Sequence, residues 1–300
     1  MGAFYQHTYE GIAEEFERTT AWLEGLGVEV RGGRMDEIAL RVGEICAAAP
    51  GLAVDEFTRR FIDDDKFWFA SVEALGLNRF FRAFAGRPRR SLPLESLRRA
   101  SSTAAVAAPS AERRTAPATS DARNILFELE LATDFGRDNL EVTHFDDFGF
   151  RFEDVAFDVQ CKRLLSPNQM TSNDRVRDAY RQLVDRFSGQ DSRGLVALRL
   201  DRVIETDSRV CYLPKGRTPQ DEAFDLARAF DPFLRDIRAE IDDPRVLGFL
   251  YYITFPCISG SAGATRALPT YAHNTVVRAF ETIPSIDWDR LKRLVLCLGG

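Results

Sequence analysis

The first hundred residues repeat apolar side chains at helical spacing, three or four positions apart. Four segments show this spacing: 7–27, 35–49, 54–62 and 65–84. A Gly-Gly pair at 32–33 and a Pro-Gly pair at 50–51 interrupt the pattern, as expected between helices. Residues 1–100 are therefore predicted to form a small all-α domain.

This hydrophobic pattern stops in residues 101–121, which are rich in Ala, Ser, Thr and Pro. Val106 is the one large apolar side chain between Ser102 and Ala122. Such a stretch buries too little surface to offset the entropy lost on ordering. We therefore predict a flexible linker at 101–121, followed by a second domain at 122–300.

The second domain has a mixed pattern. Apolar residues three or four apart predict helices, and alternating apolar and polar residues predict strands. The predicted helices are 122–135, 173–187 and 221–241, and the predicted strands are 141–145, 147–152, 157–164, 194–204 and 247–258. We expect an α/β (α+β) fold, with a mixed sheet flanked by helices.

Two consecutive predicted strands carry polar side chains on one shared face. If a four-residue loop places Phe152 opposite Phe157, then Phe150 lies opposite Val159 and the apolar residues share one face. The other face collects Asp147, Asp158, Gln160 and Lys162. Because alternation turns Asp146 to the apolar side, Asp147 is the better ligand candidate.

An acid in the preceding helix completes a candidate metal site. At about 100° per residue, Glu128 falls within the apolar arc of that helix, whereas Glu130 lies roughly opposite. A carboxylate that faces a core is costly unless it is paired or binds a metal. Glu128, Asp147 and Gln160 would supply two carboxylates and an amide oxygen, which suit Mg²⁺. Lys162 would lie beside the attacking water or the scissile phosphate.

Composition narrows the classes of protein. The chain has 300 residues, 45% of them hydrophobic, which is enough for real cores. A formal charge of −6 gives no global positive field, so nucleic-acid binding would rely on local basic groups. Five cysteines without CxxC spacing are typical of packed, reduced thiols. No apolar stretch approaches the ~20 residues that span a bilayer, and no signal sequence is recognised. We expect a cytoplasmic protein without a membrane partner.

The order of the candidate residues resembles the PD-(D/E)xK nuclease superfamily, which has the restriction-endonuclease-like fold. That motif comprises an acid in a helix, an Asp at the start of a strand, and (D/E/Q)-x-K on the next strand of a hairpin. Here the positions are Glu128, Asp147, Gln160 and Lys162. The resemblance covers about residues 122–255 and is stronger to uncharacterised bacterial members than to named restriction enzymes. The Pro of the PD pair is absent, and Gln160 replaces the commoner acid, which removes one negative charge.

The resemblance implies Mg²⁺-dependent hydrolysis of phosphodiester bonds, with DNA as the expected substrate and Mn²⁺ able to substitute. Glu128, Asp147 and Gln160 would hold the metal and, with Lys162, form the catalytic set. In the next helix, Arg177 and Arg181 share a face and Gln182 lies on an adjacent one. The resemblance implies that these residues hold the nucleic-acid backbone.

Other interpretations stay open. Asp174, Arg177, Asp178 and Arg181 also fit an ordinary solvated ion-pair face. Asp147, Gln160 and Lys162 would, on the simplest account, decorate the wet face of a hairpin while Glu128 pairs with Lys162 or Arg151. A chain that keeps the nuclease fold after losing metal would act as a nucleic-acid-binding or interaction scaffold.

Overall fold

The computed structural model describes residues 9–48, 56, 65–102, 117–136, 140–145, 147–164, 169–200, 211–213, 216–259, 270–280 and 283–298. Within these ranges the helices are α1 (Tyr9–Gly25), α2 (Arg34–Ala48), α4 (Asp65–Phe84), η2 (Arg89–Ser91), α5 (Leu94–Ser102), α7 (Pro117–Phe135), α8 (Gln169–Arg186), α9 (Pro219–Phe230), η3 (Asp231–Leu234), α10 (Arg235–Glu240) and α11 (Ser285–Leu298). The strands are β1 (Glu141–His144), β2 (Phe148–Phe152), β3 (Val155–Arg163), β4 (Arg193–Arg199), β5 (Cys211–Leu213), β6 (Val246–Ser259) and β7 (Thr270–Ala279).

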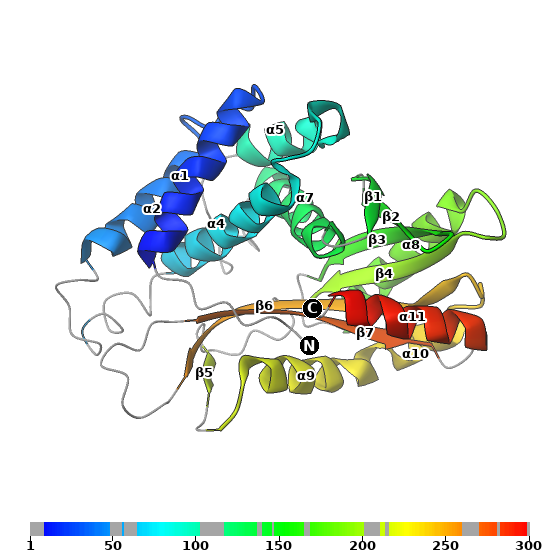
Figure 1. The fold of residues 1–300 in the computed structure, drawn as a ribbon. Helices are drawn as coiled ribbons and strands as arrows, with labels where there is room; N and C mark the ends of the chain where they lie inside the picture. The colour runs from blue at the N-terminus through cyan, green and yellow to red at the C-terminus, as the bar shows by residue number, and fades with distance from the viewer. Residues whose placement is uncertain are drawn as a thin grey trace.

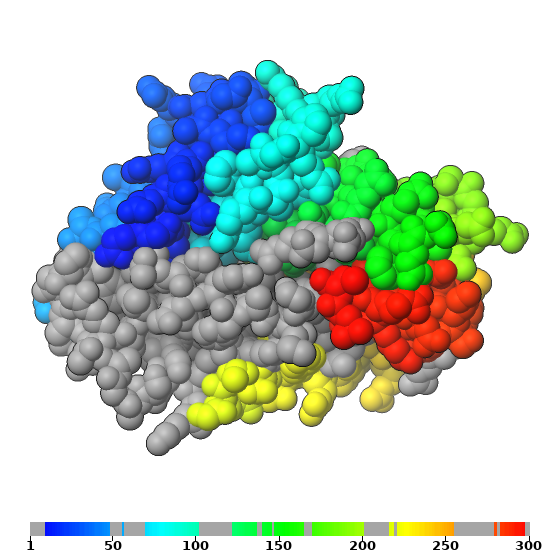
Figure 2. Space-filling view, viewed as in Figure 1, coloured from blue at the N-terminus to red at the C-terminus, as the bar shows by residue number. Residues whose placement is uncertain are grey.

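Helices α1, α2, α4 and α5 pack together at one end of the molecule (Figure 1). Three of the helices predicted in residues 1–100 are confirmed by α1, α2 and α4, and the segment 54–62 lies outside the described residues except for residue 56. Helix α5 was not predicted. In the space-filling view these helices, blue to cyan, rise as a layer above the rest of the surface (Figure 2).

Both ends of the segment predicted as a linker, 101–121, are helical. Ser101 and Ser102 end α5, and residues 117–121 already belong to α7, while residues 103–116 lie outside the described residues. Pro117 stands at the first position of α7, where its missing N–H breaks no helical hydrogen bond. A proline in a polar stretch therefore begins a helix here rather than marking a linker.

Helix α7 belongs to two hydrophobic cores. Ile125, Leu126 and Leu129 pack with the N-terminal helices, whereas Phe127, Leu131, Ala132 and Phe135 pack with the sheet. Figure 1 shows α7 between the N-terminal helices and strands β1 to β3. The all-α part and the sheet are thus joined by a shared helix.

Buried ion pairs reinforce both sides of α7. The pairs are Arg123 with Glu73 of α4, Asp134 with Arg79 of α4, and Glu130 with Arg199 of β4. Burial alone would raise the pKa of Glu73, but the Arg34 and Arg123 guanidinium groups lower it. Gly76 of α4 faces Glu130 so closely that a Cβ there would collide with the carboxylate. Removing one partner would leave a buried charge uncompensated, so these pairs fix the position of α7 relative to α4 and β4.

The described strands form one mixed, seven-stranded sheet, as expected for a sheet flanked by helices. Its order is β1-β2-β3-β4-β6-β5, with β7 on the other edge of β6. Strands β1, β2 and β3 form an antiparallel meander, whereas β3, β4 and β6 run parallel. No helix within the described ranges is long and apolar enough to cross a membrane.

The hairpin of β2 and β3 has the predicted faces but not the predicted register. Phe152 lies opposite Val155, not Phe157, and Phe150 lies opposite Phe157. A two-residue turn replaces the four-residue loop, and Glu153 opens it with a φ of 54°. The error is a shift of two residues, which leaves every side chain on its expected face.

Candidate functional site

A cavity of about 570 Å³ lies where β3 ends, between α7 and α8. In sheets with parallel strands, ligands commonly bind outside the carboxyl ends of the strands. The lining residues are Asn124, Phe127 and Glu128 of α7, Asp147, Cys161, Lys162 and Arg163 of the hairpin, and Thr171, Asp174, Arg175, Asp178 and Gln182 of α8. The structure thus brings together Glu128, Asp147, Lys162 and Gln182, which come from four separate segments.

Asp147 is held firmly at the start of β2. Its backbone takes a left-handed φ of 50°, which Asp tolerates better than most residues. Its Oδ1 accepts a hydrogen bond from the Cys161 amide at 2.9 Å. Its Oδ2 accepts one from Gln160 Nε2 at 2.6 Å and one from Arg186 Nη2 at 2.7 Å. The carboxylate therefore accepts a hydrogen bond from a backbone N–H of β3 in place of a strand carbonyl, and it also lines the cavity.

Gln160 lies on the face of β3 that α8 covers. Leu183 of α8 packs against Gly194, which is the β4 partner of Asp158 on that face. Gln160 is 1% exposed, so the expectation of a wet hairpin face is wrong for this residue. Its Nε2 donates to Asp147, while its Oε1 is buried and accepts no hydrogen bond from the described residues. A buried amide oxygen without a protein partner is available to accept a hydrogen bond from water or to contact a ligand beside Asp147.

Glu128 and Glu130 of α7 exchange the places expected from the helical wheel. Glu128 is half-buried and lines the cavity, and Glu130, expected on the outer side, is 3% exposed and pairs with Arg199 at 3.0 Å. The wheel assumed a single buried face, but α7 is buried on two sides. Glu128 therefore lines the same cavity as Asp147 and Lys162, as expected, but it does not face a core as the helical wheel predicted.

The carboxylates of Glu128 and Asp147 lie near the Cys161 thiol. Burial, and then the charges of Glu128 and Asp147, raise the pKa of Cys161 well above its usual value. The thiol thus stays neutral and packs on the apolar side of the hairpin, as its alternation with Phe157 and Val159 predicted. A neutral buried thiol is a poor nucleophile, so Cys161 contributes no covalent chemistry.

Lys162 and Arg175 are the cationic side chains of the cavity without a carboxylate partner. Lys162 is half-buried, Arg175 is exposed, and neither forms an ion pair within the described part of the chain. Arg163 also lines the cavity but is almost fully buried. Asp174 and Asp178 also line the cavity, but each pairs with an arginine outside the lining, so Lys162 and Arg175 are available to an anionic ligand.

The predicted backbone-binding arginines of α8 are both held in ion pairs. Arg177 binds Glu240 of α10 through Nε at 2.7 Å and Nη2 at 2.6 Å, and it also binds Asp174. Arg181 pairs with Asp178 at 3.4 Å and is 69% exposed. Neither lines the cavity. Spacing offered a better signal: Arg175 precedes Gln182 by seven residues, two helical turns, and so shares its face.

Two further polar groups of this region are Arg186, which sequence reasoning did not place in the site, and His144, which lies close to Asp147 in the sequence. His144 Nε2 lies 3.6 Å from Asp158 Oδ1, and its ring occupies the space above Gly149, where a Cβ would collide with it. Burial raises the pKa of Asp158, while His144 and Arg186 oppose that shift. Arg186 is thus close to two acids, Asp147 and Asp158, on the face covered by α8.

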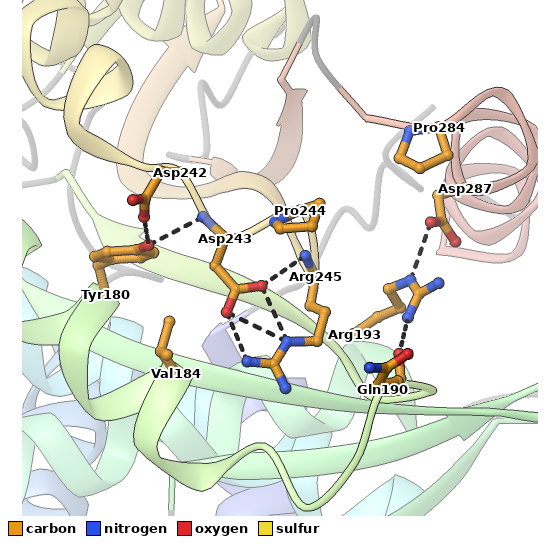
Figure 3. Close-up of a pocket in the computed structure, with 10 residues that line it drawn as sticks. All are labelled: Tyr180, Val184, Gln190, Arg193, Asp242, Asp243, Pro244, Arg245, Pro284 and Asp287. Carbon is orange, nitrogen blue, oxygen red and sulfur yellow. Dashed lines mark hydrogen bonds and ion pairs between the residues drawn. The ribbon is translucent and has the colours of Figure 1, made fainter.

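A second cavity, of about 690 Å³, lies at the other end of the sheet, where β4 and β6 begin. Figure 3 shows its charged side chains bound to partners around it. Asp242 accepts from Tyr180, Asp243 pairs with Arg245, and Arg193 binds Asp287. Because these groups compensate one another, this cavity offers a ligand little unmet charge.

Comparisons of the chain with known protein families, curated proteins and solved structures found no match. Function is therefore inferred from the geometry of the first cavity.

The residues of this cavity fit a divalent cation in kind. Glu128 and Asp147 line the cavity and supply carboxylates. Gln160 does not line the cavity, but it donates to Asp147 through Nε2, and its Oε1 would supply a third oxygen. Within the described residues no three His, Cys, Asp or Glu side chains form a metal-binding group. Asp147 Oδ2 already accepts a hydrogen bond from Arg186. A cation bound at this carboxylate would have to displace Arg186 or lie beside it.

Proposed function

We propose that the chain is a Mg²⁺-dependent nuclease of the PD-(D/E)xK type, which hydrolyses phosphodiester bonds of nucleic acid, with DNA as the expected substrate. The observation that carries this proposal is the cavity at the end of β3. It gathers two carboxylates, Glu128 and Asp147, and the unpaired ammonium group of Lys162. The same set follows from the order of the motif along the chain.

The arrangement of elements supports the same proposal. Helix α7 carries the first acid, Asp147 directly precedes β2, and β3 carries Gln160 and Lys162 as the second strand of the hairpin. Helix α8 then crosses the sheet face next to them and contributes Arg175 and Gln182 to the lining. The residues thus follow one another along the chain in the order of the PD-(D/E)xK motif, which supports the proposal.

Each residue has a distinct task in this proposal. Glu128, Asp147 and Gln160 would hold Mg²⁺, or Mn²⁺ in its place, which supplies a Lewis acid and lowers the pKa of a bound water. Lys162 donates hydrogen bonds to the attacking water or to a phosphoryl oxygen, where negative charge develops. Arg175 holds a neighbouring phosphate at the mouth of the cavity. The protein would act in the cytoplasm.

One observation favours a second candidate, a nuclease-fold protein that binds nucleic acid without cleaving it. Three donors, the Cys161 amide, Gln160 and Arg186, already satisfy Asp147 without a metal. A scaffold of this kind would bind nucleic acid in chelator as well as in magnesium. It would also keep its affinity when Asp147 is neutralised.

The test compares variants of two lysines. It uses the full chain, because α7 packs in both hydrophobic cores and belongs to neither part alone. Purified protein is incubated with single- and double-stranded DNA and with RNA, with Mg²⁺ or with chelator. Lys162→Met should reduce cleavage on the order of 100-fold, since a donor to developing charge is lost. Lys292→Met, an exposed lysine of α11 paired with Asp289, should leave the rate unchanged.

Equal cleavage by the two lysine variants would contradict the proposed role of the cavity. Binding of DNA by the wild type without cleavage under any condition would select the second candidate.

A further inference from the structure

Arg186 occupies a position that the nuclease motif does not assign. It stands in the last turn of α8, and its Nη2 donates to Asp147 Oδ2 at 2.7 Å. The side chains of Arg186 and Asp147 are 31% and 13% exposed. A guanidinium group is thus held, partly shielded from water, against the central acid of the cavity.

The contact places one positive charge where a metal ion would contribute two. A carboxylate oxygen that accepts from a guanidinium group has fewer lone-pair directions left for a cation. Two cations near one oxygen also repel each other, more strongly in a partly buried site than in water. Arg186 and a divalent cation therefore compete for Asp147.

The geometry allows Arg186 to leave without loss of the acid's position. Asp147 keeps its hydrogen bonds from the Cys161 amide and from Gln160 Nε2 when the guanidinium group withdraws. Arg186 lies at a helix end, with about a third of its side chain in contact with water. Asp158, on the same sheet face, already lies within range of its charge.

We propose that Arg186 is the resident counter-cation of the site, which neutralises Asp147 in the metal-free protein and is exchanged for a divalent cation. This inference rests on the proposed function, because it requires a cation at Asp147. Exchange makes metal binding weaker than the carboxylates alone would allow. It also keeps the buried acid paired while no metal is bound, which avoids an isolated buried charge.

The experiment measures cation binding by the full chain without nucleic acid, with Mg²⁺ by calorimetry and with Mn²⁺ by the paramagnetic resonance of the free ion. Arg186→Gln should bind both cations about tenfold more tightly than the wild type, because a competing charge-assisted hydrogen bond is removed. Arg181→Gln removes the same charge from the same helix without touching Asp147, and should bind as the wild type does. Arg186→Lys keeps the charge and should stay near the wild type.

The outcomes separate the two proposals. Equal binding by Arg186→Gln and the wild type, with binding abolished in Asp147→Ala, overturns the exchange and leaves the metal site standing. Weaker binding by Arg186→Gln, in a variant whose thermal unfolding matches the wild type, also overturns it. Absence of binding in both the wild type and Arg186→Gln overturns the exchange together with the metal site.

Discussion

Two cavities at opposite ends of one sheet differ in how their charges are compensated. Around the cavity where β4 and β6 begin, Arg193 and Arg245 are each bound to an acid of the same cavity. Around the cavity where β3 ends, Lys162 and Arg175 have no carboxylate partner in the described part of the chain, and the nearby Gln160 Oε1 has no donor there. Polar groups without protein partners are candidates for contact with a ligand or with water. The difference favours the cavity where β3 ends as the candidate site.

The largest effect is expected from a comparison of two variants, each with one acid replaced in one of the two cavities. Asp147 and Asp243 are matched, because their side chains are 13% and 14% exposed and each pairs with an arginine. Asp147→Asn should reduce Mg²⁺-dependent cleavage on the order of 1,000-fold, since a ligand charge is lost at the reacting centre. Asp243→Asn should cleave at the wild-type rate. A comparable loss in both variants would show that the cavities do not differ in function.

A smaller effect is expected from one paired and one unpaired arginine of α8. Arg175→Ala should weaken DNA binding about tenfold and reduce the slope of log affinity against log salt concentration by about one, because one phosphate contact is lost. Arg177→Ala removes an arginine bound to Glu240 and should change neither quantity. Titrations of DNA binding at several salt concentrations measure both quantities. A larger effect from Arg177→Ala than from Arg175→Ala would show that the DNA interface lies on the Arg177 side of α8.

The smallest effect concerns stability, and it should appear in the self-compensated cavity. The hydrogen bonds of Arg245 lower the pKa of the Asp243 carboxyl group. A depressed pKa stabilises the fold at pH values above the unfolded-state pKa, and this contribution is lost as pH falls through the folded-state pKa. Asp243→Asn should therefore cost about 1 kcal/mol at pH 7, and the difference from the wild type should shrink in acid. Urea unfolding at pH 7 and pH 3 measures it; a difference that grows in acid would contradict the assigned pairing.

The faces of the hairpin were predictable from local alternation, but its register was not. Phe150 and Val159 are buried on one face and Gln160 lies on the other, because side-chain direction is a property of the extended backbone. A slip of two residues preserves every face, so alternation cannot distinguish Val155 from Phe157 as the partner of Phe152.

The helices show a similar division. The apolar spacing predicted the segment that became α8, yet it could not choose which polar stripe meets the cavity. Arg177 was expected there, but Glu240, which is 63 residues away in sequence, holds it on another side. The linker was predicted from composition, and Pro117 nevertheless begins α7 because the helix packs against two layers.

By itself, the sequence determined the mixed α and β class, most helices and strands, and the identity of Glu128, Asp147, Gln160 and Lys162 as candidates. These properties depend on residue type and on the short periods of helix and strand. The tertiary structure decided that Glu130 is buried, that Arg175 rather than Arg177 lines the cavity, and that Arg186 meets Asp147 from 39 residues away. Such contacts depend on how separate layers pack, and no local pattern specifies that packing.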